Sequence, residues 1–274
     1  MRIKYLSPLV MAIVLCLTMY VIHTKKANST NHSMQPVNQL YALDKYNNPI
    51  IIEWYTTSII SSQFAASMSS IWNIAREAYL PVEMQFLRAF PDVVFQEKYF
   101  ESFKPLFEEG IHKVNWSTAE TKMEAMLQSH FVFDPASFSD AMKTMFADDV
   151  CFFAVSKDIK GAIVGFVTFI VRSNYAVGDV KVMSLGVVPS HQNCGLGKLL
   201  MSSIFNIMPT VKRIFLCTRV TNEIALRAYA NWGFAKDIDP VMDHPFNSLH
   251  WTFLEYKIER SDILQKVATE LIVH

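Results

Sequence analysis

The chain has 274 residues, with 25 acidic and 25 basic side chains and no net charge. No run of basic residues exceeds two, so the sequence gives no sign of a nucleic-acid partner. The length suits one large domain or two small ones, and the four cysteines lack the paired spacing of a Cys-x-x-Cys metal site, as expected in a reducing compartment.

The N-terminus holds an uncharged apolar run over residues 6–22, preceded by Arg2 and Lys4 and followed by Lys25 and Lys26. Such a run is either a signal-peptide core or a short membrane anchor. Bases on both flanks and the lack of an Ala-x-Ala-like cleavage site favour an uncleaved hydrophobic helix. We therefore divide the chain into an anchor or signal segment (1–26), a polar spacer (27–36) and a folded domain (37–274).

The first part of the folded domain changes from strand to helix patterns. Residues 39–57 hold two apolar runs separated by a turn signal at 45–49, and the second run, 50–55, is the predicted first strand. Residues 57–150 show helical spacing, with predicted breaks at Pro81, Pro91 and Gly110. Its aromatic residues, including Tyr79, Phe95 and Phe103, are predicted to be core.

Strands and helices then alternate. Residues 151–155 and 162–171 are predicted to form a hairpin, and 180–188 a buried strand that Pro189 ends. A helix over 197–208, a strand over 212–218 and a helix after Asn222 follow. The last predicted strand is 251–258, and 261–273 is predicted to be an amphipathic tail helix.

The turn between strand 180–188 and helix 197–208 has the sequence features of an anion-binding site. Residues 192–197 read Gln-Asn-Cys-Gly-Leu-Gly, and main-chain N–H groups at a helix start bind phosphate. A Walker loop is excluded, because Leu199 follows Gly197-Lys198 and Gln192 stands where the first glycine is needed. A dinucleotide fingerprint is excluded, because Leu200 replaces its third glycine.

Two motifs in this region resemble a known family. Gln192, Gly195 and Gly197 match the Gln/Arg-x-x-Gly-x-Gly/Ala signature of the GCN5-related N-acetyltransferase (GNAT) superfamily. Thirty residues on, the chain matches that family's Asn-x-x-Ala-x-x-x-Tyr-x-x-x-Gly-Phe helix at Asn222, Ala225, Tyr229, Gly233 and Phe234. The resemblance covers residues 151–258 well. It implies an α/β (α+β) fold with a mixed, mostly antiparallel central sheet flanked by helices, an enlarged helical part (57–150) and a cofactor-binding core (151–258).

The second motif has a physical logic of its own. Thr221 or Asn222 can cap the helix, and Asn222, Ala225 and Tyr229 then share one face. Gly233 suits the left-handed residue that ends a helix, and Phe234 can fold back as its apolar contact. The spacing alone fits a core tyrosine equally well. The resemblance favours a functional one, because in that family this tyrosine faces the thioester sulfur.

The resemblance implies an acetyl-CoA-dependent N-acyltransferase, with acetyl-CoA or another acyl-CoA as co-substrate and no metal. The pantetheine arm is expected along main-chain groups of Leu185 and Val187, Asn222 is expected to contact that arm, and Tyr229 is expected to act as general acid. The diphosphate is expected on Gln192, Asn193, Cys194, Gly195, Leu196, Gly197 and Lys198.

The general base departs from the family pattern. Several members carry a glutamate six residues before the position of Val187, where this chain has Lys181. Asp179 is a nearby carboxylate, His244 and His250 fit ordinary loop residues better than a base, and some members use a water chain instead. The acceptor is therefore left open between a small-molecule amine and a peptide or protein amine.

Two broader alternatives stay open. The missing glutamate and the enlarged helical part keep a second function in view, a catalytically inactive acyl-CoA-binding module acting as a sensor or interaction platform. Because acyl-CoA is a cytosolic metabolite, a membrane-attached chain is expected to hold its domain in the cytosol. Export after signal cleavage is the other possibility. The acyl chain length, membrane side and oligomeric state are not encoded in any pattern that we recognise.

Overall fold

The computed structural model describes residues 38–56, 62–131, 150–237 and 250–273, which belong to one compact unit, Pro36–His274. The predicted N-terminal hydrophobic helix lies outside these residues, as does His244. Within the part of the chain that is described, no helix has both the length and the apolar character needed to cross a membrane.

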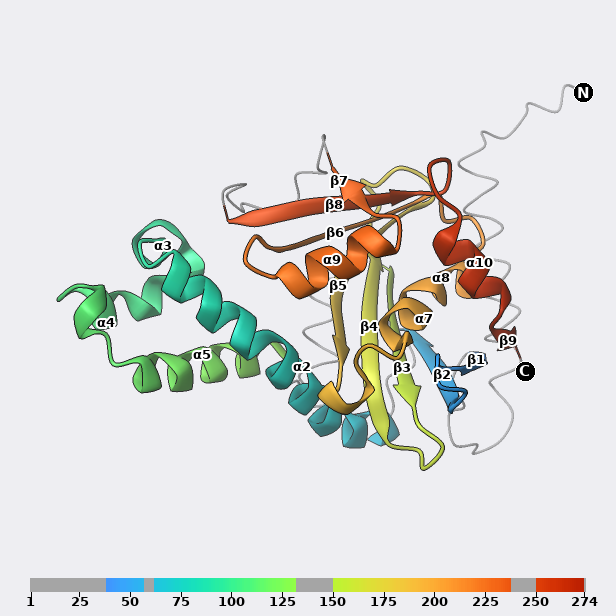
Figure 1. The fold of residues 1–274 in the computed structure, drawn as a ribbon, viewed down its shortest axis with the longest axis horizontal. Coiled ribbons are helices and arrows are strands. Elements are labelled where there is room, and N and C mark those ends of the chain that lie inside the picture. Colours follow the sequence, from blue (N-terminus) through green and yellow to red (C-terminus); the bar gives the residue numbers. More distant parts are fainter. Residues whose placement is uncertain (1–37, 57–61, 132–149, 238–249, 274) are drawn as a thin grey trace, which may run out of the picture. The chain divides into compact units, whose positions relative to one another are not determined.

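A nine-stranded sheet organises the unit, in the order β7-β8-β6-β5-β4-β3-β2-β1-β9 (Figure 1). Neighbouring strands are antiparallel except β5 and β6, so the expected mixed, mostly antiparallel sheet is confirmed. The strands are β1 (Asn38–Leu43), β2 (Pro49–Thr56), β3 (Val150–Lys157), β4 (Ile163–Val171), β5 (Asp179–Val187), β6 (Arg213–Arg219), β7 (Ala235–Lys236), β8 (Trp251–Lys257) and β9 (Ile272–Val273).

Helices between β2 and β3 fill the predicted enlarged helical part: α2 (Ser62–Ala89), α3 (Val93–Gln96), η2 (Lys98–Phe103), α4 (Lys104–Phe107), η3 (Ile111–Lys113) and α5 (Trp116–Phe131). They enclose a second apolar core, which includes Leu87, Phe103 and Met123. The prediction that the aromatic residues here are core holds for Phe103 but is wrong for Phe95, which is 52% exposed.

The predicted break at Pro81 is wrong, because α2 continues through it. A proline inside a helix removes one main-chain hydrogen bond and destabilises the helix by about 3 kcal/mol. Pro81 is on the exposed side, where water can serve the carbonyl that it leaves free. Buried Leu80 and Met84 hold the helix in the apolar core on either side of it.

The predicted helix over 197–208 is interrupted at Ser203, which separates α7 (Leu196–Ser202) from α8 (Ile204–Ile207). The short helix η4 (Pro189–His191) precedes α7. The hydroxyl of Ser202 donates to the Lys198 carbonyl and that of Ser203 to the Leu200 carbonyl, each at 2.7 Å. Such bonds compete with the helical pattern and bend the chain. The remaining helices are α9 (Glu223–Asn231) and α10 (Ile263–Thr269).

The sequence also missed two strands. β1 precedes the predicted first strand and pairs with it, and β9 follows the tail helix and pairs with β1. The carboxylate of Asp44 accepts main-chain bonds from Tyr46 and Asn48 at 2.8 Å, and Asn47 takes a left-handed φ of 65°. The predicted turn therefore connects β1 to β2 as a hairpin.

The central strands diverge where the sequence predicts the cofactor site. β5 pairs with β6 only from Asp179 to Lys181, and the register of β4 and β5 shifts between Thr168 and Phe169, leaving Met183 as an extra residue. Such a bulge bends the strand. From there to Val187, the edge of β5 that faces away from β4 pairs with no strand among the described residues.

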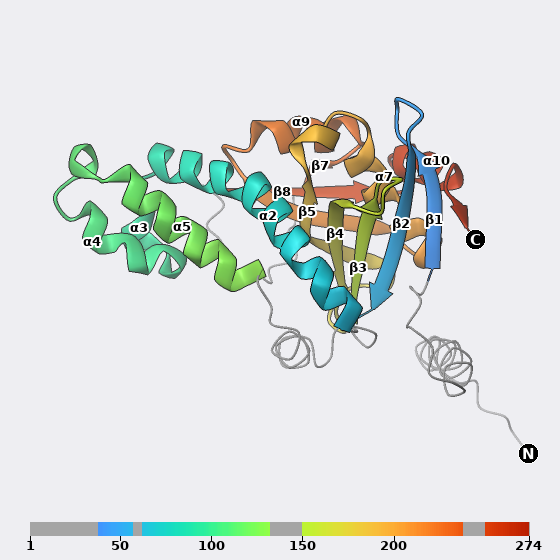
Figure 2. The same cartoon turned by 90° about the horizontal axis from the view of Figure 1, so that it is seen from below.

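The two faces of the sheet carry different helices (Figure 2). A Cβ on Gly186 would approach Ile74 of α2 to 3.1 Å, whereas one on Gly197 of α7 would lie 3.9 Å from Val187. Because neighbouring residues of a strand point to opposite faces, α2 covers one face at the end of β5 and α7 covers the other.

Candidate active site

The turn before α7 adopts the conformation that a phosphate site needs. Gly195 has a φ of 88°, in the left-handed region, and α7 begins directly after it. The N–H groups of Lys198 and Leu199 donate to the Gly195 carbonyl. The N–H groups of Asn193, Leu196 and Gly197 donate to no acceptor in the described residues, as is usual at a helix start. They are therefore available to an anion.

Cys194 holds the turn in place instead of lining the open side of it. Its side chain is 3% exposed, and its Sγ donates to the His191 carbonyl at 2.6 Å. The Cys194 carbonyl accepts a bond from the main-chain N–H of Lys45 at 2.9 Å, which joins the turn to the β1–β2 hairpin. The side chain of Cys194 is therefore not open to an anion, and the prediction that Cys194 binds the diphosphate can concern only its main chain.

α9 begins and ends as its motif predicts. Of the two capping candidates, Asn222 is the cap: its Oδ1 accepts the N–H bond of Ala225 at 3.2 Å. At the other end Gly233 has a φ of 92°, and the N–H of Phe234 donates to the Tyr229 carbonyl at 3.0 Å. The Phe234 ring lies 5.5 Å from the Tyr229 ring, so it folds back as expected.

Tyr229 lies in a protected position beside the turn. Its side chain is 9% exposed and its ring packs edge-on against Trp232 at 5.4 Å. Trp232 in turn lies against Gly197, whose Cβ would come within 3.1 Å of the indole. Burial raises the pKa of the Tyr229 phenol far above its ordinary value, and Tyr79 and Cys217 nearby raise it further. The phenol thus stays protonated across the physiological range.

The main-chain groups of β5 expected to hold the cofactor arm are bound by side chains. The N–H of Leu185 donates to the Tyr79 hydroxyl at 2.9 Å, and that hydroxyl lies 3.1 Å from the Leu185 carbonyl, to which it donates. The Val187 carbonyl accepts a bond from Gln192 Nε2 at 3.0 Å. The sequence identified Gln192 but treated Tyr79 only as a core aromatic residue.

Family comparison agrees with this geometry. Residues 106–234 match the model of the acetyltransferase (GNAT) family. Residues 106–234 therefore correspond to a GNAT acetyltransferase domain. The match ends at Phe234 and so includes the turn, α7 and α9, while β1, β2 and α2 precede it. A comparison with curated proteins gives no match.

Solved structures resemble the GNAT domain at low sequence identity. PaiA N-acetyltransferase from Thermoplasma acidophilum, in complex with coenzyme A, is 12% identical, with 75% of this chain and 98% of that chain covered and a TM-score of 0.45. Spermidine N-acetyltransferase from Vibrio cholerae, in complex with CoA and spermine, is 18% identical, with 47% and 78% covered and a TM-score of 0.36. A GNAT acetyltransferase from Staphylococcus aureus Mu50 is 18% identical, with 44% and 76% covered and a TM-score of 0.37.

The two candidate bases that the structure describes, Asp179 and His250, are held by partners other than Tyr229. Asp179 begins β5 and forms an ion pair with Arg213 at 3.4 Å. Because a strand rises about 3.3 Å per residue, Asp179 lies about 20 Å from Leu185. Lys181 is 3% exposed in the sheet. His250 is buried, with Nδ1 2.6 Å from Glu97 Oε1.

A buried charge cluster that the sequence did not reveal lies on the α2 side of the GNAT domain. Glu83, one helical turn beyond Tyr79, binds Arg219 at the end of β6 through Oε1 and Oε2, at 3.0 and 2.9 Å. The Arg219 guanidinium also lies over the rings of Phe86 and Trp251, at 4.0 and 3.9 Å. A glutamate within an otherwise apolar helix face is the only sequence signal for this cluster.

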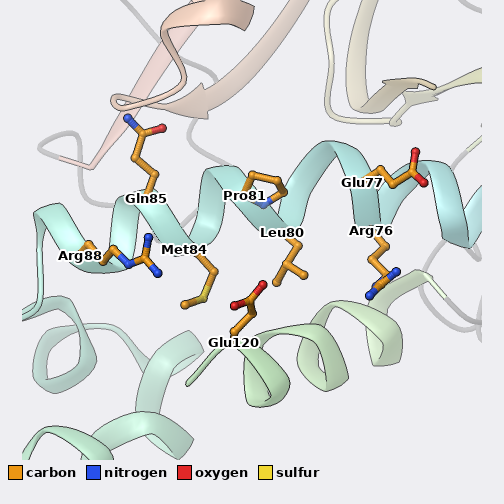
Figure 3. Close-up of a pocket in the computed structure, with 8 residues that line it drawn as sticks. All are labelled: Arg76, Glu77, Leu80, Pro81, Met84, Gln85, Arg88 and Glu120. Carbon is orange, nitrogen blue, oxygen red and sulfur yellow. The ribbon is translucent and has the colours of Figure 1, made fainter. Parts of the chain in front are cut away.

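A separate pocket of about 420 Å³ lies between α2 and α5 (Figure 3). Leu80, Met84 and Arg76 point toward α5, while Gln85 points away from it. No residue of β5, of α9 or of the predicted diphosphate turn (residues 192–198) lines it. We therefore do not assign it to the acyl-transfer site. Among the described residues, no three His, Cys, Asp or Glu side chains form a group able to hold a metal ion.

Proposed function

We propose that the chain is an acetyl-CoA-dependent N-acyltransferase that moves an acyl group from coenzyme A to an amine by direct attack. The observation that carries this proposal is the phenol of Tyr229, buried, protonated and joined to the diphosphate turn through the contact of Trp232 with Gly197. The match of residues 106–234 to the GNAT family model supports the reaction class.

In this proposal the cofactor lies across three elements. The diphosphate is held by main-chain N–H groups of residues 192–198, with the α7 dipole and Lys198 favouring the negative charge. The pantetheine arm follows the free edge of β5 at Leu185 and Val187. Asn222 uses its amide to contact that arm, although its Oδ1 already accepts from Ala225 and its Nδ2 donates to Thr218. The Oδ1 and the Nδ2 of Asn222 can each form one more hydrogen bond.

The chemistry needs a neutral amine, a positioned thioester and a proton donor. The amine nitrogen attacks the thioester carbonyl, the carbon–sulfur bond breaks, and the departing thiolate takes the proton of the Tyr229 hydroxyl. The proton released by the amine then reprotonates the phenolate through water, so that the products are an amide and free coenzyme A. A hydrogen bond from the Leu185 N–H to the thioester oxygen stabilises the charge that develops there.

Binding and turnover can be tested separately on the full chain. Acetyl-CoA should raise its melting temperature, and a panel of small amines and peptides should include one that releases free thiol. Stabilisation without turnover on any amine would favour the alternative, an inactive acyl-CoA-binding module, which Lys181 in place of the strand glutamate also favours. Absence of stabilisation would contradict both functions.

A further inference from the structure

The starting point is the edge of β5 that β6 leaves open. In a strand, the N–H and C=O of one residue point to the same side, and neighbouring residues alternate. Val188 donates to Val164 of β4, so Leu185 and Val187 direct their main-chain groups the other way, toward the side that β6 has left. Main-chain groups removed from water need partners. Here side chains provide them for the N–H and C=O of Leu185 and for the C=O of Val187.

The Tyr79 hydroxyl completes the hydrogen bonds of Leu185 much as a neighbouring strand would. It accepts the N–H at 2.9 Å and donates to the C=O at 3.1 Å, which a hydroxyl can do with a single oxygen atom. The tyrosine lies 106 residues away in sequence and comes from α2. The pattern of donor and acceptor that it presents is that of a peptide or pantetheine amide.

The position of α2 is fixed on both sides of Tyr79. Ile74 packs so closely over β5 that a Cβ on Gly186 would lie 3.1 Å from it. Glu83, one turn further on, is bound to Arg219 at the end of β6. These contacts keep the main chain of Tyr79 beside Leu185, so the hydroxyl can leave Leu185 only by rotation of the tyrosine side chain. The Gln192 side chain that binds Val187 is exposed and can turn into solvent.

We infer that the Tyr79 hydroxyl is a placeholder for the acyl-CoA arm, holding the Leu185 main chain in the free protein and moving away when the thioester binds. This inference rests on the proposed function. The Leu185 N–H cannot serve both the hydroxyl and the thioester oxygen with a full hydrogen bond, so binding of acyl-CoA must break contacts that the free protein already has. Removal of the hydroxyl should therefore improve cofactor binding, the opposite of what a cofactor-binding tyrosine would show.

The test compares Tyr79→Phe with Tyr41→Phe in the full chain. Tyr41 is a matched control, because its hydroxyl donates to Gln39 on β1, away from the site. We expect Tyr79→Phe to lower the melting temperature of the free protein and to bind acetyl-CoA about fivefold more tightly by calorimetry, since a hydrogen bond contributes about 1 kcal/mol. Tyr41→Phe should leave the Kd for acetyl-CoA unchanged.

The outcomes separate the inference from the proposed function. An unchanged Kd would mean that the hydroxyl stays in place in both states, and a higher Kd would mean that it binds the cofactor; either result overturns the placeholder. If the parent chain does not bind acetyl-CoA, the proposed function fails as well. Should Tyr79→Phe not fold, a crystal structure of the parent chain with acetyl-CoA decides: Tyr79 still bonded to Leu185 contradicts the inference, and a displaced hydroxyl supports it.

Discussion

At the scale of single residues, the two glycines of the diphosphate turn are needed for different reasons. Gly195 has a φ of 88°, which strains any residue with a Cβ, yet nothing lies within 4 Å of where that Cβ would be. Gly197 has an unexceptional backbone, but a Cβ there would meet the Trp232 ring at 3.1 Å. The first glycine permits the shape of the turn, and the second permits its contact with α9.

The two alanine variants should therefore differ in what they disturb. Gly195→Ala should cost about 1–2 kcal/mol of folding free energy through backbone strain, and it should weaken acetyl-CoA binding because the turn relaxes. Gly197→Ala should instead shift Trp232 and, with it, the fluorescence of the protein. Denaturant titration, calorimetry and emission spectra would check both. Equal effects of the two variants on all three measurements would contradict this distinction.

The proposed chemistry depends on the phenol of Tyr229. Tyr229→Phe removes the proton donor and keeps the ring that packs against Trp232 and Phe234. We expect turnover to fall about 100-fold, the lower end of what a general acid contributes, while the Kd for acetyl-CoA stays nearly constant. Steady-state kinetics and calorimetry measure the two quantities. A large loss of affinity would mean that the hydroxyl is structural.

At the scale of elements, local patterns predicted much of the secondary structure between residues 180 and 234 well. The strand 180–188, the turn after it and the helix after Asn222 depend on glycines, a cap and apolar periodicity, which all act within a few residues. The same kind of reasoning failed at Pro81, where tertiary packing carries α2 past a local helix breaker. It could not find the bond between Tyr79 and Leu185, because no local pattern records a contact across 106 residues.

The attachment of α2 to the sheet depends on a buried ion pair. The Glu83 and Arg219 side chains are 8% and 2% exposed, so removing one charge leaves the other without its main partner in a poorly solvated place. Glu83→Gln should cost about 3 kcal/mol of unfolding free energy by denaturant titration. Its control is Glu124→Gln, which breaks the exposed pair with Arg76 and should cost less than about 1 kcal/mol.

The double variant Glu83→Gln/Arg219→Met would show whether the loss comes from the charge left behind. Removing both charges should recover part of the stability lost in Glu83→Gln, because no buried ion remains without a partner. The two substitutions would then be strongly non-additive. Additive losses would indicate that each side chain contributes through packing alone.

At the scale of the whole folded unit, a second group of charges joins the start of β5 to β6 and β8. Arg213 of β6 lies 3.4 Å from Asp179, 2.7 Å from Asp237 and 2.9 Å from Glu255. Glu255 also contacts Lys257 and Arg260, at 3.1 and 2.8 Å. This group closes the sheet at the end where β5 and β6 are paired, and our proposal places the cofactor at the opposite end of β5.

Two carboxyl groups of this cluster, Glu255 and Asp179, should give opposite pH dependences. Burial opposes the ionised form of both. For Glu255, bonds to Lys257 and the charges of Arg213 and Arg260 outweigh burial and lower the pKa below the ordinary 4.5, whereas for Asp179 burial outweighs Arg213 and raises the pKa above 3.8. Ionised Glu255 thus stabilises the fold above about pH 4.5, and that contribution is lost as the pH falls through its folded pKa. Asp179 behaves in the opposite sense, because the folded state holds its proton more tightly than the unfolded state does. Its protonated form stabilises the fold at low pH, and that contribution is lost as the pH rises through its folded pKa.

Glu255→Gln should therefore unfold more easily than the parent chain at pH 7, by about 1–3 kcal/mol for a buried charged partner, and the difference should shrink below pH 4. Asp179→Asn should cost less at pH 7, because it removes a carboxylate whose ionised form the fold disfavours. Urea titrations of the three proteins at pH 7 and pH 3 measure both effects. A Glu255→Gln deficit that is the same at both pH values would show that the carboxylate acts through shape and not through charge.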